Sequence, residues 1–298
     1  MGRRGFGVIA ICAAVAMVAL AEPEAYVRHI VEDRIEGSYI TNVPDDSQPP
    51  PNPLGFRSVD NWCAPLAAAN AIVFLDQVAE AEWAIKVSGG FSPDALSAYL
   101  GYFLATNGEG SPDRDNASLR RPGTLNSDIP AGVAGFVRWS GGRPPVPMSK
   151  ESYAWHVDLR EADAGLETLW EAYCEVIEKG IPAVLCFAFW NPTNPTALKL
   201  LLSSGDAATV SVYLWGEPLP STEPLRKEDG KIPEEEWDEK RGIGHAVTGV
   251  GFLKGDPDGD GPLPEGLWAI VHDNWSTTAE DVVIPWDHLT ALVRFLPE

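Results

Sequence analysis

The chain has 298 residues, of which 45% are hydrophobic, so it is long enough and apolar enough to bury a sizeable core. Its 43 acidic and 22 basic residues give a formal net charge of −21. A surface this acidic repels nucleic acid and anionic lipid, which argues against both as partners.

The first residues have the pattern of an export signal. Arg3 and Arg4 precede an apolar run from Phe6 to Leu20, and Ala19 to Ala21 provides the A-x-A pattern of a cleavage site. No later run is long enough to span a bilayer. We therefore expect residues 1–21 to be removed as a signal peptide, and the mature protein to be secreted or periplasmic without a membrane span.

Residues 22–56 are expected to form an N-terminal arm rich in proline. Residues 22–37 could form an amphipathic helix, and residues 38–43 a short strand that ends at Pro44. The prolines between positions 49 and 53 favour a stiff, extended chain, because proline fixes its φ angle and has no N–H donor. We expect this arm to lie across the domain formed by residues 57–298.

The stretch from Asp60 to Ala71 predicts a polar loop followed by a helix, with Cys63 in the first helical turn. The first N–H groups of a helix lack intrahelical partners, and the helix dipole at this end favours a thiolate. The same N–H groups could bind the oxyanion formed when a carbonyl is attacked. This is a setting for a nucleophile, although a small apolar residue at the start of a core helix has the same pattern.

The rest of the chain contains both helical and strand patterns. The acidic insertion at residues 217–241 comes just before His245, and it could be either the wall of a cleft or a solvated loop. The two strands that follow it form a hairpin. The expected helices are residues 64–78, 92–105, 127–139, 166–179 and 285–293, and the further strands are residues 151–160, 183–190, 209–214, 245–254 and 267–275.

Two distant segments supply partners for a cysteine nucleophile. His245 begins one predicted strand, and Asp273, Asn274 and Trp275 close the next. Histidine can take up a thiol proton near neutral pH and return it to a leaving amine, while a carboxylate or amide fixes the imidazole tautomer. The order of cysteine, histidine and then aspartate or asparagine therefore fits a catalytic triad.

In this order and spacing the sequence resembles the papain-like cysteine peptidases, and more closely the bacteriocin-processing peptidase-like group. The resemblance covers most of the span from Asp60 to Trp275. It implies an α+β fold in which a nucleophile-bearing helix packs against an antiparallel sheet. It also implies a peptide or protein substrate and no required cofactor. The matching segments are residues 62–65 with 68–70, 123–124, 128–129, 179–184, 244–247 with 249 and 251, and 271–275.

The resemblance also implies roles for individual residues. Cys63 would be the nucleophile, His245 the general base, and Asp273 the residue that holds the imidazole. Asp273 takes this role because alignment on Trp275 places it at the orienting position. His272 is interpreted as an exposed or cross-strand side chain outside the catalytic set.

One departure from the family pattern concerns the oxyanion hole. Such families place a glutamine several residues before the cysteine, whereas the sixth position before Cys63 is Arg57 here. Asn61 is the candidate substitute, with Asn274 as an auxiliary residue and the Cys63 backbone N–H as the other donor. Three functions therefore stay open: a secreted cysteine peptidase, an amidase acting on cell-wall peptides, and a secreted binding or structural module that has lost catalysis.

A loop between the last two long strands carries aspartates in alternation. Asp256, Asp258 and Asp260, followed by glycine, could wrap a structural calcium ion, and Glu265 could contribute. The acidic residue that would complete a twelve-residue calcium loop falls on Leu267 instead. The alternative is an exposed turn, for which Asp, Gly and Pro are equally suited.

The mature chain would keep three cysteines, Cys63, Cys174 and Cys186. An odd number leaves at least one thiol free or paired with another chain. Cys174 and Cys186 could pair with each other, or both could be buried thiols. Neither has histidines at zinc-binding spacing.

Overall fold

The computed structural model describes residues 23–32, 34–48, 54, 61–79, 91–108, 123–126, 128–141, 149–152, 165–187, 190–216, 226–227, 230–231, 244–255, 263–278 and 281–296. The predicted signal peptide, the aspartates of the predicted calcium loop and most of the acidic insertion 217–241 lie outside these residues.

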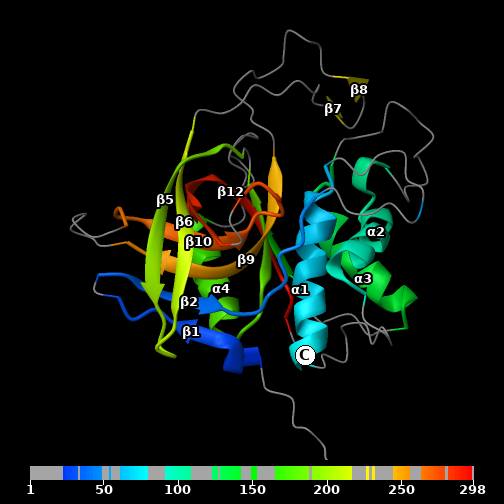
Figure 1. The fold of residues 1–298 in the computed structure, drawn as a ribbon. Coiled ribbons are helices and arrows are strands. Elements are labelled where there is room, and N and C mark those ends of the chain that lie inside the picture. The colour runs from blue at the N-terminus through cyan, green and yellow to red at the C-terminus, as the bar shows by residue number, and fades with distance from the viewer. Residues whose placement is uncertain are drawn as a thin grey trace, which may run out of the picture.

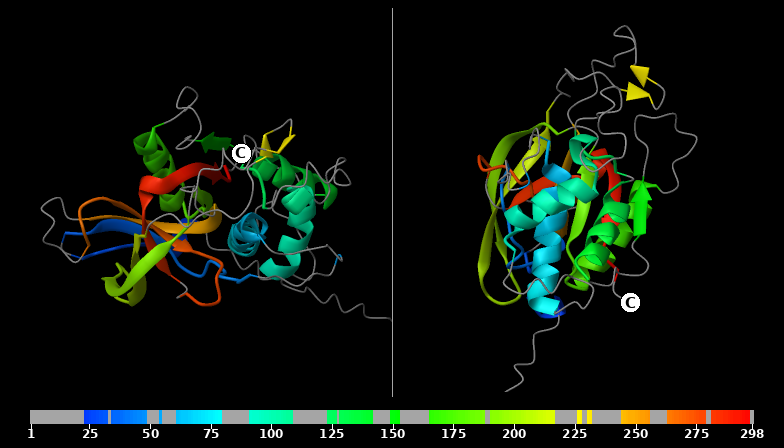
Figure 2. Two further views of the ribbon diagram at one scale, coloured as in Figure 1. Left: turned by 90° about the horizontal axis from the view of Figure 1, so that it is seen from above. Right: turned by 90° about the vertical axis from the view of Figure 1, so that its right-hand side faces the viewer.

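Four helices and a curled sheet make up the described part of the molecule, a mixed α and β fold as predicted. Helices α1 (Cys63–Ala79), α2 (Pro93–Phe103) and α3 (Asp128–Trp139) gather on one side, and the sheet forms the other (Figure 1). Seen from above, α1 lies between the sheet and the other two helices (Figure 2). Helix α4 (Leu166–Glu178) packs on the sheet as well.

Strand β9 is the centre of the sheet. Its first half pairs with β4, its second half with β2, and its other edge with β10. Every named strand pair described is antiparallel except β11 with β6. The strands are β1 (Val27–His29), β2 (Glu36–Ile40), β3 (Ser149–Ser152), β4 (Ala183–Phe187), β5 (Pro192–Leu201), β6 (Ala207–Trp215), β9 (His245–Lys254), β10 (Leu267–His272), β11 (Val282–Pro285) and β12 (Leu289–Arg294), with β7 (Arg226–Lys227) and β8 (Gly230–Lys231) as a separate hairpin.

The sheet curls until its far edge meets the N-terminal strands. Ile30, next to β1, forms a bridge with Leu202, next to β5, and the Val31 N–H donates to the Leu201 carbonyl. Strands β9, β10, β11, β6, β5, β1 and β2 therefore follow one another around a nearly closed ring. Closure pairs backbone groups that an open edge would leave exposed.

The sequence of β9 reflects burial on both faces. Nine of its ten residues are buried, and it shows no polar alternation. Thr248 donates to the Ala67 carbonyl of α1, whereas a Cβ on the adjacent Gly249 would meet Tyr173 of α4. Since neighbouring side chains of a strand point to opposite faces, α1 and α4 cover opposite sides of β9.

Helix α1 is buried nearly all round because it has neighbours on several sides. Its alanines at positions 64, 67, 68, 69 and 71 are each at most 3% exposed. Their small side chains let the helix approach both β9 and α2 closely. Just before the helix, the fully buried Trp62 packs against Gly101 of α2, and its indole N–H donates to the Ser97 carbonyl.

Most predicted elements occur within a few residues of their expected places, but two predicted helices are wrong. Residues 22–37 form a short 3-10 helix, η1 (Pro23–Tyr26), followed by strand residues. Residues 285–293 form η5 (Trp286–His288) and then β12, whose pairing with β4 and β3 buries its apolar side chains. Long-range pairing overrode local helical spacing in both segments. Strands β5 and β11 were not predicted.

None of the helices within the described ranges is long and apolar enough to cross a membrane.

The contact between Trp62 and Gly101 predicts the effect of adding one methyl group. In Gly101→Ala the new Cβ would lie 1.8 Å from Trp62 Cζ2, so the indole must move. We expect a loss of about 2 kcal/mol in the free energy of unfolding, as overpacked cores show. Urea unfolding followed by tryptophan fluorescence measures it.

The matched control is Gly135→Ala in α3, where the nearest atom to the new Cβ is Phe103 Cδ1 at 3.3 Å. Alanine also raises helix propensity there by up to about 1 kcal/mol. Its effect should be much smaller than that of Gly101→Ala. Equal stability of the two variants would contradict the described packing of Trp62.

Candidate active site

Cys63 is the first residue of α1, as the sequence predicted. The Trp62 carbonyl accepts the first helical hydrogen bond, from the Leu66 N–H at 3.2 Å, so the chain enters the helix directly before the cysteine. The Cys63 thiol lies against the start of β9, where it is hydrogen-bonded to the backbone of Ala246. Ala246 directly follows His245. Cys63 therefore lies beside the backbone at the start of β9, one residue from the position that carries the imidazole.

The Cys63 thiol is less easily ionised than the sequence suggested. Burial raises its pKa above the ordinary value of 9.0, and hydrogen bonds with the backbone of Ala246, Ala64 and Cys63 itself lower it only in part. The expectation of a thiolate stabilised by the helix end was therefore wrong. Removal of water costs the charged sulfur more than these backbone groups return.

His245 begins β9 inside an aromatic enclosure and is only 7% exposed. Its ring centroid lies 4.7 Å from that of Trp190 and 5.1 Å from that of Trp275. Burial lowers the pKa of His245 to about 4, although the hydrogen bond to the Asp273 backbone acts in the opposite direction. The imidazole is therefore neutral at neutral pH.

The tautomer of His245 follows from its one hydrogen bond. Nε2 lies 2.7 Å from the main-chain carbonyl oxygen of Asp273. A carbonyl only accepts, so Nε2 carries the hydrogen and Nδ1 keeps a free lone pair. A neutral imidazole with an unprotonated nitrogen is the form that a general base requires.

Asp273 lies at the site, but its carboxylate does not contact the imidazole. Oδ1 instead accepts hydrogen bonds from the Trp275 N–H, at 3.0 Å, and from the Thr278 hydroxyl. Oδ2 is buried without a partner among the described residues. The expected carboxylate to imidazole bond is thus replaced by a bond from the imidazole to the main chain of the same residue.

The two candidates for the oxyanion hole, Asn61 and Asn274, differ in burial and in hydrogen bonding. Asn274 is fully buried, and its side chain donates to the Ala246 carbonyl and accepts from Asn70, so it is not available to a substrate. Asn61 has a positive φ of 57° and an exposed side chain for which the described part of the chain offers no hydrogen bond.

Gln48 is the residue that sequence reasoning missed. Its Oε1 accepts a hydrogen bond from the Trp62 N–H at 3.1 Å, which places the amide beside the start of α1. Its own N–H donates to the Asn274 carbonyl at 2.8 Å. Because the Trp62 N–H occupies the oxygen, the Nε2 donor points away from Trp62. No local signal marks Gln48, since fourteen residues and several prolines separate it from Trp62.

His272 is buried and contacts Asp281 on the neighbouring chain segment, so of the two alternatives, exposed or cross-strand, the structure has the cross-strand one. Its Nδ1 lies 2.9 Å from the Pro44 carbonyl and its Nε2 lies 3.3 Å from Asp281 Oδ1. The Tyr39 hydroxyl donates to the same carboxylate. Burial alone would lower the pKa of His272, but the Asp281 hydrogen bond, the charges of Asp45 and Asp281 and the Pro44 carbonyl together raise it. His272 thereby ties the arm to β10.

The other two predicted site features receive no support from the structure. No disulfide joins Cys174 and Cys186, so of the two alternatives the structure has separate thiols, of which Cys186 is buried. Within the described ranges, no group of three or more His, Cys, Asp or Glu side chains could hold a metal ion. The aspartates at positions 256, 258 and 260 lie outside those ranges.

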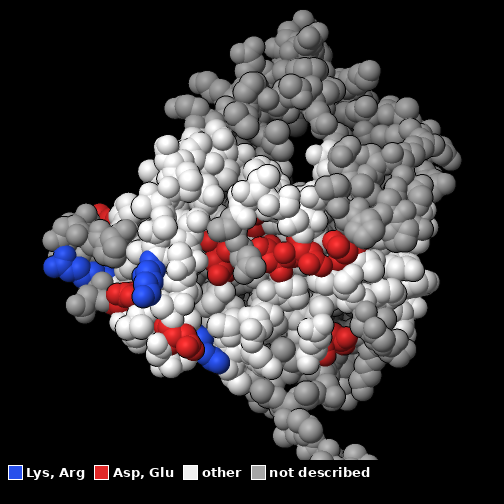
Figure 3. Space-filling view, viewed as in Figure 1, with Lys and Arg blue, Asp and Glu red and all other residues white. Residues whose placement is uncertain are grey.

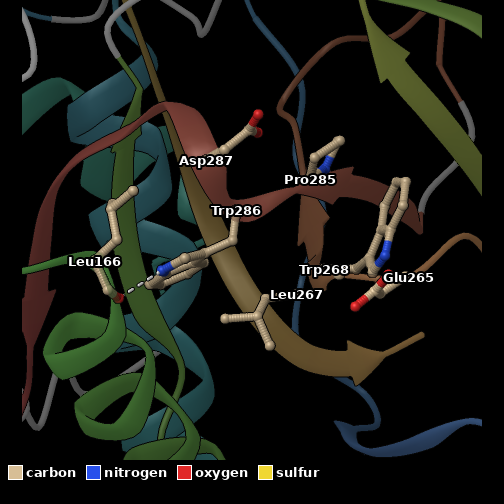
Figure 4. A pocket seen from close by; sticks show the side chains of 8 residues that line it. Leu166, Glu265, Leu267, Trp268, Pro285, Trp286 and Asp287 are labelled. Carbon is tan, nitrogen blue, oxygen red and sulfur yellow. Dashed lines mark hydrogen bonds between the residues drawn. The ribbon is translucent and has the colours of Figure 1, made fainter. Parts of the chain in front are cut away.

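A hollow elsewhere in the molecule is not a candidate for this chemistry. Figure 4 shows it at the start of β10 and the end of β11, with a volume of about 290 Å³. The indole N–H groups of Trp268 and Trp286 are already bonded to the carbonyls of Pro264 and Leu166. Glu265 and Asp287 are its charged lining residues, and it contains no nucleophile.

No protein-family model matches the sequence, and no curated protein matches it. The geometry around Cys63 and His245 therefore carries the functional argument.

The buried pair of His272 and Asp281 predicts a pH dependence of stability. The pKa of His272 in the folded protein is raised above its unfolded value of about 6.5. Its contribution to the free energy of unfolding is therefore complete below about pH 6.5, and it is lost as the pH rises through the folded-state pKa. His272→Gln should lose about 3 kcal/mol at pH 6, because it leaves a buried carboxylate without its cation. The deficit relative to wild type should shrink as the solution becomes alkaline.

Urea unfolding at several pH values measures this effect. His29→Gln, at an exposed position of β1, is the control and should parallel the wild type. A constant deficit for His272→Gln at every pH would show that the imidazole is not charged in the folded protein.

Proposed function

We propose that this protein is an exported thiol hydrolase of papain-like fold, which cleaves peptide bonds through an acyl-enzyme. The observation that carries the proposal is the contact between the Cys63 thiol at the start of α1 and the first residues of β9, where His245 is held as a neutral Nε2–H imidazole. Cys63 begins a helix, and the backbone that its thiol touches belongs to the residue that follows His245. Such a constellation suits acyl transfer.

The mechanism begins from a neutral thiol and a neutral imidazole. Nδ1 of His245 takes the thiol proton as the sulfur attacks the substrate carbonyl, which gives a tetrahedral oxyanion. The imidazolium then protonates the leaving amine as the carbon to nitrogen bond breaks, leaving a thioester on Cys63. Water attacks the thioester with His245 again acting as base, which releases the acid and restores the thiol.

Two donors at the start of α1 suit the oxyanion. One is the Cys63 backbone N–H, which belongs to the unpaired first turn of the helix. We assign the other to Nε2 of Gln48, whose oxygen is already fixed by the Trp62 N–H. On this assignment Gln48 takes the role that the family pattern gives to a glutamine near position 57.

The surface charge bears on the substrate. A band of acidic side chains crosses the face of the molecule shown in Figure 3, in keeping with the net charge of −21. Such a surface attracts cationic peptides and repels strongly anionic ones. The exposed part of the Trp275 indole, which lies near His245, suits an uncharged side chain next to the scissile bond.

The alternative is a secreted binding module on the same fold. It is favoured by the raised pKa of Cys63 and the lowered pKa of His245, since both directions oppose a preformed thiolate and imidazolium pair. A catalytic protein must form that pair during the reaction. A binding module never does, so turnover separates the two functions.

The first prediction concerns the nucleophile and the base. Cys63→Ala and His245→Ala should each lower kcat/KM on a peptide library by a factor on the order of 10³ or more. In the wild type, kcat/KM should fall as the pH drops through about 4, because His245 then becomes protonated. Cys174→Ala, in α4 near Lys254 at the other end of β9, is the matched control. Absence of turnover on unmodified, basic and cell-wall peptides alike would favour the binding module.

The second prediction separates donation from positioning at Gln48. Gln48→Ala should lower kcat by about 10²-fold with little change in KM, as loss of one oxyanion donor does. Gln48→Glu keeps an acceptor for the Trp62 N–H but replaces the donor with oxygen, so it should be at least as impaired as Gln48→Ala. Recovery of activity in Gln48→Glu would mean that Gln48 only holds Trp62.

A further inference from the structure

We infer that the main-chain carbonyl of Asp273 orients His245. In this arrangement Asn274 is the positioning residue, which fixes this carbonyl and helix α1 relative to the start of β9. The catalytic meaning of this inference depends on the proposed function, but the geometry it describes does not. It departs from the expectation that the Asp273 side chain completes a triad.

The first step is the conformation of Asn274. Its φ is 62°, in the left-handed region that asparagine tolerates better than most residues. The peptide group between Asp273 and Asn274 contains the carbonyl that accepts from His245 Nε2. The direction of that carbonyl therefore depends on the turn that Asn274 makes directly after β10.

The second step is the side chain of Asn274, which joins two elements. Its Nδ2 donates to the Ala246 carbonyl at 3.2 Å, one residue after His245. Its Oδ1 accepts from Nδ2 of Asn70 in α1 at 3.0 Å. The main-chain carbonyl of Asn274 adds a third attachment, because it accepts from the Gln48 N–H at 2.8 Å.

The third step is the position of Asn70. It lies about two helical turns after Cys63, so both side chains point from the same face of α1 toward β9. Asn70 also donates to the Thr248 hydroxyl at 3.4 Å, and that hydroxyl donates to the Ala67 carbonyl at 3.2 Å. Asn70, Thr248 and Asn274 are all fully buried. Their bonds are therefore shielded from water and fix α1 relative to the start of β9.

The fourth step is what the Asp273 carboxylate does instead. Its bonds to the Trp275 N–H and the Thr278 hydroxyl close a local turn after the strand. A shorter side chain with one acceptor can keep part of that turn, but it cannot reach an imidazole. Asp273→Ser therefore separates the two roles of the residue.

The experiment compares Asp273→Ser with Asn274→Gly. Glycine keeps the positive φ but removes the side chain that joins α1 to β9. We expect Asp273→Ser to stay within about 10-fold of the wild-type kcat/KM, whereas loss of an orienting triad carboxylate costs about 10⁴-fold. Asn274→Gly should lose about 10²-fold in kcat with a small change in KM, because misplaced catalytic groups slow the chemical step.

A second readout is independent of turnover. Nitrogen NMR of the full chain with labelled histidine reports which ring nitrogen of His245 carries the proton. The Nε2–H tautomer should persist in Asp273→Ser and become mixed in Asn274→Gly. If the wild type turns over no substrate, the proposed function fails while this measurement still decides the positioning role.

Thermal unfolding identifies variants that fail to fold. If Asn274→Gly does not fold, Asn70→Ala removes only one of the bonds to Asn274 and should show the same tautomer mixing to a smaller degree. Two results would overturn the inference. One is loss of the Nε2–H tautomer in Asp273→Ser, and the other is a wild-type tautomer in both asparagine variants.

Discussion

The hydrogen bond from His245 Nε2 to the main-chain carbonyl of Asp273 is the interaction on which the site depends. It fixes the tautomer of the imidazole, and so it decides which nitrogen is free to act as a base. The bond joins the first residue of β9 to the end of β10, two strands paired along most of their length. The imidazole of His245 is thus held by the main chain that directly follows β10, and not by a side chain.

Water exclusion sets the electrostatics of the site. The rings of Trp190 and Trp275 enclose the imidazole, and the partly buried Cys63 lies against the start of β9. Both groups are therefore neutral at rest, although the thiol stands at a helix end whose dipole favours the anion. On the proposed function, the charges on the sulfur and the imidazole form only during the reaction with a bound substrate. Neutral resting groups are equally compatible with binding, which is why turnover is the decisive measurement.

The N-terminal arm connects the two halves of the site. Pro44 receives a hydrogen bond from the buried His272, and Gln48 bonds both to Asn274 after β10 and to Trp62 before α1. The curled sheet closes through the same N-terminal region, where Ile30 meets Leu202. The arm thus contributes to the sheet, to the junction between sheet and helices, and, on the proposed function, to the oxyanion hole. A buried ion pair at His272 fixes where it crosses the sheet.

Sequence alone predicted most of the main elements and the places of Cys63 and His245 within them. Helical spacing after Cys63 and the two apolar strands around positions 250 and 270 are local patterns, and they placed Cys63 in the first turn and His245 at a strand start.

Tertiary structure decided what those patterns could not. The segment at 289–294 became a strand because neighbouring strands offered it pairing partners, and Gln48 came to Trp62 because the arm folds back. Whether the side chain or the main chain of Asp273 faces His245 depends on the turn at Asn274, and the pKa shifts depend on burial. Hydrogen-bond direction and water exclusion arise from contacts between distant segments, which no local pattern encodes.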